Sequence, residues 1–260
     1  MQLLILLILP FAVELSIFNV VAYPVERWTW DDLVNNSSKS IPSTNQEPEK
    51  NFYLGKSPIS TTLQLDLSAS KIKKGSFKIA AFGTSTTRLF KSSTTLDVCA
   101  KRTYYVTERV TETNGSLVTK SIDTLHDSQK QFRNLSMEIT CIVWAQALLD
   151  IVYDFVAESS GQPPFHIPQF RFVELTLALD SERSQSLDSR KQKKAVFLVE
   201  EVIAEDQQGP FRKYLNNVSP NPLQMTTKKD DDRARFLAFS QHVQYWKTEK
   251  QVFVSDYQGK

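Results

Sequence analysis

The stretch that most limits the fold is a short apolar run that ends in two acids. Residues 195–199 are all apolar, and Glu200 and Glu201 follow them directly. A short apolar run bounded by turn signals is typical of a buried strand. Because carboxylates are rarely buried unless they are paired, we expect the strand to emerge at Glu200 and Glu201 into a connection or a cleft. The plainer alternative is a strand that simply reaches solvent.

Other periodic patterns predict more strands and two helices. Residues 62–67 alternate apolar and polar side chains, as a half-buried strand should. Further strand candidates are residues 77–82, 89–90, 98–106, 170–179 and 251–255. The clearest helix covers residues 135–156, where apolar residues recur three or four positions apart and Asn134 can cap the start. A second helical pattern covers residues 234–245, so the fold class is α+β.

Composition limits the size and the partners of the protein. The 260 residues, of which 41% are apolar and 23% charged, suffice for one large or two small folded domains. A net charge of +2 gives no reason to expect a nucleic acid as partner. Cys99 and Cys141 are the two cysteines, and their spacing is not that of metal ligands. A single disulfide between them remains open.

The N-terminal part divides into an apolar and a polar segment. Residues 1–23 are mostly apolar and have Glu14 as their only charged side chain, and residues 24–53 form a polar stretch typical of a linker. The first segment resembles a secretory signal or a membrane anchor, although a buried N-terminal helix is the alternative. We therefore expect a folded domain over residues 54–260. Its location is cytoplasmic, or secreted or membrane-anchored if the apolar segment acts as a signal.

Two later stretches have the composition of loops. Residues 180–194 are charged and rich in serine, which indicates a solvated loop. Residues 219–233 contain two prolines and the acidic triplet that starts at Asp230, which indicates a mobile loop. Adjacent carboxylates on a loop could bind a divalent ion, but they more often repel one another and stay hydrated.

One lysine and one turn carry possible phosphate chemistry. Residues 77–90 combine a single glycine, Gly83, with a run of hydroxyl side chains, and small residues let backbone N–H groups approach a phosphate. An ordinary hairpin is the alternative. Lys101 lies inside an apolar strand, where a cation calls for an anionic partner. Because neighbouring residues in a strand face opposite sides, Lys101 and Arg102 cannot both point inward.

Two motifs resemble those of the alpha-kinases, a family of atypical protein kinases. In that family an apolar strand runs into a Glu-Glu or Glu-x pair, then into a Gly-Phe/x-Lys-Tyr-Asn-Asn pattern. The matching residues here are Val199, Glu200, Glu201, Gly209, Phe211, Lys213, Tyr214, Asn216 and Asn217. The family's Asp-x-Gln-Gly signature matches residues 256–259. The resemblance covers residues 54–260 and implies a two-lobed, protein-kinase-like fold.

The resemblance implies transfer of the ATP γ-phosphate to a serine or threonine of a protein substrate. It assigns the phosphates to Lys101, oriented by Glu138 on the long helix. It also places Gly83 and Arg88 in the segment that covers the nucleotide. Glu200 and Glu201 would line the adenine site. Asp256 would be the catalytic acid and would hold Mg²⁺ together with Gln258.

The match departs from the family at the C-terminus. The family continues beyond the position of Lys260 into further acidic, substrate-binding and zinc-binding segments, so the resemblance is to a truncated, fungal-type member with an incomplete second lobe. His242 lies near the place of a zinc-binding histidine, but one ligand does not make a zinc site. The alternative function is a degenerate module that binds nucleotide or a protein partner without catalysis. Such a module could be secreted, since Asn114 and Asn217 begin glycosylation sequons.

Overall fold

A computed structural model describes residues 15–36, 53–113, 116–181, 194–203 and 210–259. It contains the following strands and helices in chain order: β1 Ser16–Pro24, α1 Trp30–Asn35, β2 Ile59–Leu65, β3 Lys73–Lys74, β4 Lys78–Ser85, β5 Asp97–Thr113, β6 Ser116–Leu125, α2 Ser128–Glu158, β7 Leu175–Asp180, β8 Val196–Glu201, β9 Arg212–Lys213, α4 Lys228–Lys247 and β10 Gln258–Gly259. This mixture of sheet and helix is the α+β class that the sequence predicts. Gly209, part of the predicted hinge motif, and most of the predicted loop over residues 180–194 lie outside the described residues.

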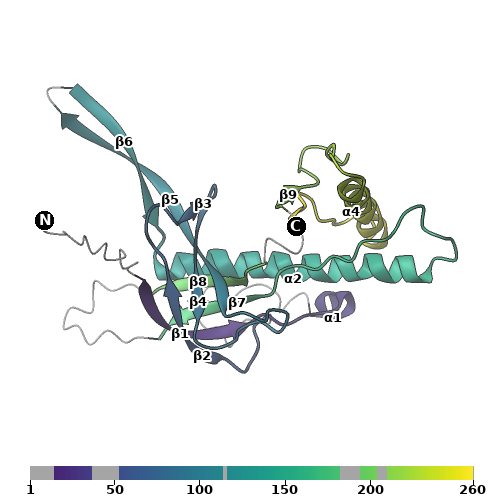
Figure 1. The fold of residues 1–260 in the computed structure, drawn as a ribbon, viewed down its shortest axis with the longest axis horizontal. Helices are drawn as coiled ribbons and strands as arrows, with labels where there is room; N and C mark the ends of the chain where they lie inside the picture. The colour runs from purple at the N-terminus through teal and green to yellow at the C-terminus, as the bar shows by residue number, and fades with distance from the viewer. Residues whose placement is uncertain (1–14, 37–52, 114–115, 182–193, 204–209, 260) are drawn as a thin grey trace, which may run out of the picture.

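Six antiparallel strands form a closed ring. The main sheet has the order β3-β4-β2-β1-β7-β8-β5-β6, and β4 also pairs with β5, which joins the two ends of the central six strands. Beyond this ring, the outer parts of β5 and β6 continue as a two-stranded hairpin that projects away from the body (Figure 1). Closure leaves the strand that carries Lys101 hydrogen-bonded on both sides, by β4 and by β8.

The ring has an apolar interior and an apolar outer face. Side chains alternate between the two faces of each strand. Phe197 and Val199 of β8 belong to the inner core cluster, and Val196 and Leu198 belong to the outer cluster that packs against α2. Burial on both faces explains why residues 195–199 are uniformly apolar. The strand predicted there is confirmed.

Gly83 lies where the ring closes. It pairs with Leu65 of β2 on one side and with Val98 of β5 on the other. A Cβ atom on Gly83 would lie 1.9 Å from the carbonyl oxygen of Gln64. Only a residue without a side chain fits where two backbones approach so closely.

The sheet begins earlier than the domain boundary at residue 54 that composition predicts. β1 falls within the predicted apolar segment, and it lies between β2 and β7 in the ring. Val20 and Ala22 point into the inner core and are almost fully buried. Helix α1 lies within the predicted linker, and its Leu33 is fully buried. Apolar residues that composition alone assigns to a signal or anchor therefore form part of the sheet.

Helix α2 is longer than its sequence pattern predicts and supports both halves of the molecule. It begins at Ser128, seven residues before the predicted start, and its cap is Asp127, which accepts a hydrogen bond from the Lys130 N–H at 2.8 Å. The predicted cap, Asn134, lies inside the helix. By length and composition α2 could cross a membrane, a test that the buried core helices of soluble proteins also pass.

The C-terminal part is a small lobe built on α4. Thr227 caps this helix and accepts a hydrogen bond from the Asp230 N–H at 3.1 Å. The loop predicted over residues 219–233 is therefore wrong from residue 228 onward, because capping outweighs the acidic composition. The strand predicted at residues 251–255 is also wrong, since the chain there is irregular and only β10 pairs, with β9.

Candidate functional site

A cleft of about 1490 Å³ separates the strand ring from the small lobe. The ring contributes side chains from β4, β5 and β8, and the lobe contributes side chains from α4 and β10. Its polar and charged lining residues are Lys101, His166, Gln169, Arg171, Glu200, Glu201, Lys228, Lys229, Asp232, Arg233 and Gln258. Ala80, Phe82 and Cys99 add an apolar area beside Lys101. Apolar walls with a few convergent charges are typical of a ligand site.

Lys101 is paired within the cleft, although its partner differs from the predicted one. Its Nζ atom donates a hydrogen bond to the Glu200 carboxylate at 2.5 Å. Glu138 instead forms an ion pair with Lys78 of β4. The predicted pair of Lys101 with Glu138 is therefore wrong. The physical reason is register, since Cys99 pairs with Glu200 across β5 and β8 and brings Glu200 onto the face of Lys101.

The electrostatics of this wall follow from burial and from the ion pair. Burial alone would lower the pKa of Lys101, but the charge of Glu200 and its hydrogen bond outweigh burial, so the pKa is raised and the ammonium group stays charged. Burial raises the pKa of the neighbouring Cys99 thiol to about 11. Cys99 is therefore a neutral, inert wall residue. Both cysteines are free, so the disulfide left open by the sequence does not form.

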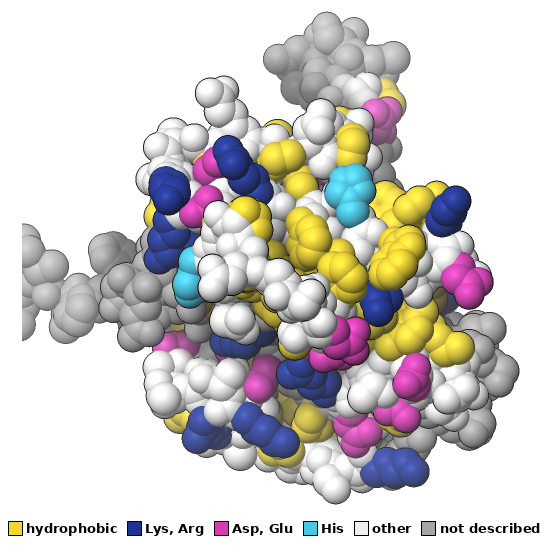
Figure 2. All heavy atoms as spheres, turned by 90° about the vertical axis from the view of Figure 1, so that its right-hand side faces the viewer, with side chains coloured by type: hydrophobic (Ala, Val, Ile, Leu, Met, Phe, Trp, Pro, Cys, Tyr) yellow, Lys and Arg dark blue, Asp and Glu magenta, His cyan; other side chains and the backbone are white. Residues whose placement is uncertain are grey.

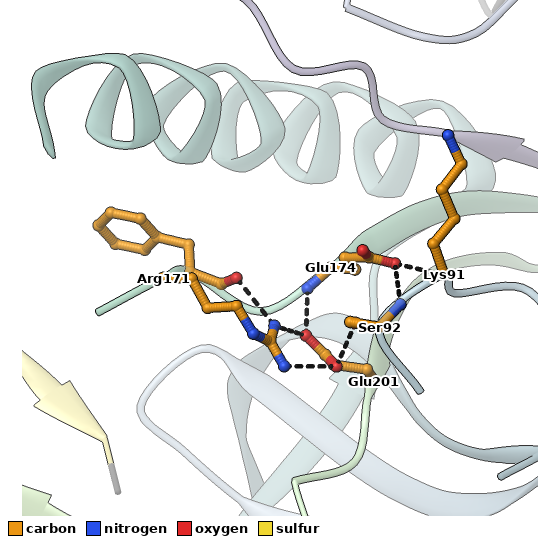
Figure 3. Close-up of polar contacts among 6 residues, drawn as sticks. Lys91, Ser92, Arg171, Glu174 and Glu201 are labelled. Atoms are coloured by element: carbon orange, nitrogen blue, oxygen red, sulfur yellow. Dashed lines mark hydrogen bonds and ion pairs between the residues drawn. The ribbon is translucent and has the colours of Figure 1, made fainter. Parts of the chain in front are cut away.

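Glu201 ties three segments together at the end of β8 (Figure 3). Its carboxylate accepts hydrogen bonds from both terminal nitrogens of Arg171, from the Ser92 hydroxyl at 2.7 Å and from the Glu174 N–H at 2.7 Å. The Glu174 carboxylate in turn accepts a hydrogen bond from the Lys91 N–H at 2.7 Å. Glu201 was predicted to line the adenine site. It does line the cleft, but its oxygens are already engaged by protein groups.

Replacing Glu201 with glutamine should reduce the pH dependence of stability. Burial alone would raise the pKa of Glu201, but the hydrogen bonds from Arg171, Glu174 and Ser92 outweigh burial and lower it. As pH falls, the unfolded chain then takes up this proton first, so the carboxylate contributes stability at neutral pH that is lost below its ordinary pKa of 4.5. Urea unfolding should show that the free energy of unfolding differs between wild type and Glu201→Gln, and that this difference becomes smaller from about pH 7 to about pH 4.

Glu158 provides the control for this experiment. Its carboxylate is 3.9 Å from the Lys247 ammonium and is largely exposed. An exposed ion pair contributes roughly 0–1 kcal/mol, so Glu158→Gln should change little at either pH. A gap for Glu201→Gln that stays constant over the same range would contradict the assignment.

Gly83 and Arg88 do not form the predicted phosphate-binding turn. Gly83 is an internal residue of β4, where it allows the ring to close. Arg88 lies in the connection after β4 and donates hydrogen bonds to the carbonyl oxygens of Phe90 at 3.0 Å and Lys91 at 2.6 Å. Neither residue lines the cleft. The hydroxyl-rich composition of this stretch instead reflects local bonds such as Ser85 Oγ to the Thr87 carbonyl.

Asp256 and Gln258 lie on the small lobe at the opposite side of the cleft from Lys101. Gln258 lines the cleft, and Asp256 forms an ion pair with Lys213 at 2.5 Å. Asp256 has a φ of 60°, in the left-handed region that few residues other than glycine adopt. A carboxylate and an amide oxygen are ligands of the type that Mg²⁺ prefers. Gln258 faces the cleft, whereas the Asp256 carboxylate is engaged by Lys213 and does not line it.

The structure adds three lysines that the sequence did not single out. Lys78 lies on the same face of the sheet as Lys101, since the register pairs Ala80 with Lys101 and side chains alternate. Lys228 and Lys229 line the cleft from the first turn of α4. Cations are unfavourable at a helix N-terminus, so this placement is the sequence signal that could have marked them.

The end of the small lobe presents aromatic side chains to solvent. Figure 2 shows hydrophobic side chains gathered on this face among acidic and basic ones. Trp246 is 64% exposed and packs edge-on against Phe155, with the Lys247 ammonium near both rings. His242 is exposed on the same helix. Within the described residues no group of three or more potential metal ligands is found around it or elsewhere.

Comparison with known proteins identifies one family. The model of the alpha-kinase family matches residues 95–260. Among solved structures, the apoenzyme alpha-kinase domain of myosin-II heavy chain kinase A is 15% identical, with a TM-score of 0.45 over 93% of this chain and 79% of that chain. An inactive variant of that domain in complex with ATP is 14% identical, with a TM-score of 0.44 over 94% and 79%. No curated protein matches the chain.

Proposed function

Because the chain belongs to the alpha-kinase family, we propose that it transfers the γ-phosphate of ATP to a serine or threonine of a protein substrate. The observation that carries this proposal is the charged cleft between the ring and the small lobe. It brings Lys101 and Glu200 from one side together with Lys228 and Gln258 from the other. These residues come from distant parts of the sequence, as a two-lobed nucleotide site requires.

The ring side of the cleft would bind the nucleotide. Phosphate oxygens would replace Glu200 as the partner of the Lys101 ammonium, whose raised pKa keeps it charged. Lys78 is a second cation on this face, held by Glu138. Phe82 and Ala80 line the cleft and offer apolar surface to a base, while residues 200–203 present backbone groups at the end of β8. Glu201 holds that backbone in place through Arg171.

The lobe side would hold the metal and the acceptor. Asp256 and Gln258 are the residues that would bind Mg²⁺, which neutralises charge on the transferred phosphate. Lys228 and Lys229 face the cleft from the same side and attract anionic groups. Phosphate transfer depends mainly on positioning and on charge stabilisation. The contribution of the chain would therefore be to hold these side chains in fixed positions around the phosphate and the acceptor.

Calorimetric titration of the full-length chain with Mg-ATP tests the proposal. We expect Lys101→Met to weaken binding by about tenfold or more, equivalent to about 1.4 kcal/mol. Lys73→Met is the matched control, because Lys73 is exposed on the short edge strand β3 and does not line the cleft. Transfer of labelled γ-phosphate to a protein acceptor is then compared with the Asp256→Ala variant. Absence of Mg-ATP binding to the folded wild type would overturn the proposal.

A second candidate is a module that binds nucleotide without turnover. It is favoured by the position of Asp256, whose carboxylate is paired with Lys213 and does not line the cleft. In that case Mg-ATP binding would persist and would still depend on Lys101. Phosphate transfer by the wild type would be no greater than transfer by Asp256→Ala.

A further inference from the structure

The segment that leads to Asp256 is held by two glutamines of α4. The Gln241 amide donates a hydrogen bond to the Val254 carbonyl at 2.9 Å. The Gln244 carbonyl oxygen accepts from the Val254 N–H at 2.8 Å, and its amide nitrogen donates to the Tyr257 hydroxyl at 3.1 Å. Residues 252–257 form neither helix nor strand, so these bonds replace the ladder that would otherwise fix them.

The glutamines are buried, which makes these bonds obligatory. Gln241 is 6% exposed, Gln244 is fully buried, and Tyr257 is 8% exposed. A buried amide without partners is strongly disfavoured, so both side chains are committed to this segment. Positions 241 and 244 are three apart and therefore lie on one face of the helix. The buried face of α4 also carries Phe236 and Leu237, and buried amides beside such apolar residues need specific hydrogen-bond partners.

The segment held in this way carries the acid of the proposed metal site. Asp256 adopts a left-handed backbone conformation, which persists only where the surrounding structure enforces it. The Tyr257 carbonyl on its C-terminal side accepts from the Tyr214 N–H at 2.8 Å. Val254 and Tyr257 are thus both fixed by hydrogen bonds. Asp256 lies between them in the chain, and Gln258 follows directly after Tyr257.

We propose that Gln241 and Gln244 are positioning residues that hold Asp256 and Gln258 in the geometry needed for phosphate transfer. They act through Val254 and Tyr257 and do not line the cleft themselves. This role rests on the proposed function for its catalytic consequence. Its structural part, the immobilisation of residues 252–259, is independent of that function.

The test combines kinetics with hydrogen exchange on the full-length protein. Gln244→Met keeps a similar volume but removes the amide, so kcat should fall about tenfold or more while KM for ATP changes less than about twofold. Amide exchange should accelerate over residues 252–259 and stay unchanged in β4 and β5. Ser240→Ala is the matched control, because Ser240 is equally buried on α4 but bonds only to the Phe236 carbonyl of its own helix.

Two milder variants keep the proposal open to refutation if Gln244→Met does not fold. Tyr257→Phe removes only the hydroxyl, and Gln241→Met removes only the bond to the Val254 carbonyl. Each should accelerate exchange over residues 252–259 and lower kcat more than it raises KM. Unchanged exchange in a folded variant would overturn the proposal. If exchange accelerates in the variants but the wild type shows no measurable turnover, the immobilisation of residues 252–259 by the glutamines would stand and the proposed kinase activity would be refuted.

Discussion

A chain that begins at residue 25 should fail to fold, whereas one that begins at residue 15 should unfold cooperatively like the full chain. The difference between them is β1, which lies in the middle of the ring. It pairs along most of its length with β2 and from Val20 to Pro24 with β7. Its removal would separate these two strands and open the ring.

The energy lost with β1 is comparable to the stability of a whole domain. Each backbone hydrogen bond contributes roughly 0.5–1.5 kcal/mol, and burial of a side chain such as Val20 contributes roughly 1.5–3 kcal/mol. Two ladders and the apolar contacts of Val20 and Ala22 together approach the roughly 5–15 kcal/mol that stabilises a typical protein.

Circular dichroism and thermal melting of the two shortened chains measure this effect. A chain from residue 25 with a melting temperature within a few degrees of the longer one would contradict the central role of β1. The result also bears on processing, because cleavage after Ala22 would remove seven of the nine residues of β1.

Replacing Gly83 with alanine should cost about 3 kcal/mol or more of unfolding free energy. The added Cβ would lie 1.9 Å from the Gln64 carbonyl oxygen and 2.9 Å from the Leu65 Cα, both backbone atoms. Both atoms belong to β2, and backbone atoms cannot move aside as a flexible side chain can, so β4 would have to shift away from β2. This shift weakens the pairing of β2 with β4 in the ring. Urea unfolding at constant pH measures the change.

Gly161 is the matched control for this substitution. No atom lies within 4 Å of a Cβ placed on Gly161, so Gly161→Ala should change the unfolding free energy by less than about 0.5 kcal/mol. Equal effects of the two substitutions would show that the close approach at Gly83 is not required. A large effect of Gly83→Ala alone would show that the glycine is structural, in agreement with its absence from the residues that line the cleft.

Local patterns predicted most elements but not the way they join. The strands near residues 62–67, 77–82 and 98–106 exist, because alternation reflects burial on one face. The helix predicted over residues 135–156 is confirmed, because its apolar residues recur three or four positions apart over the whole stretch. Ring closure was not predictable, since the pairing of β4 with β5 adds no periodic signal to either strand. The start of α4 at residue 228 could not be predicted from composition, because the capping residue Thr227 stands in a stretch with the composition of a charged loop.

Of the predicted site residues, Lys101, Glu200, Glu201 and Gln258 line the cleft, and Gly83, Arg88, Glu138 and Asp256 do not. Lys101, Glu200 and Gln258 do line one cleft, because strand ends and the terminal motif meet there. The partner of Lys101 could not be predicted, since it depends on the register between β5 and β8. Arg171 was missed because nothing in its neighbourhood marks an arginine that will reach the end of a strand 30 residues later.

Helix α2 has a mechanical consequence for any motion of the cleft. Its first half packs against the ring through residues such as Leu135 and Ile139, and its second half packs against α4 through Val152. One continuous helix therefore packs against both the ring and the small lobe (Figure 1). Because α2 packs against both the ring and α4, a closure that bends the molecule between them would break one of these contacts. A twist or a slide about α2 keeps both contacts, so we expect closure over a ligand to move the small lobe sideways across the ring.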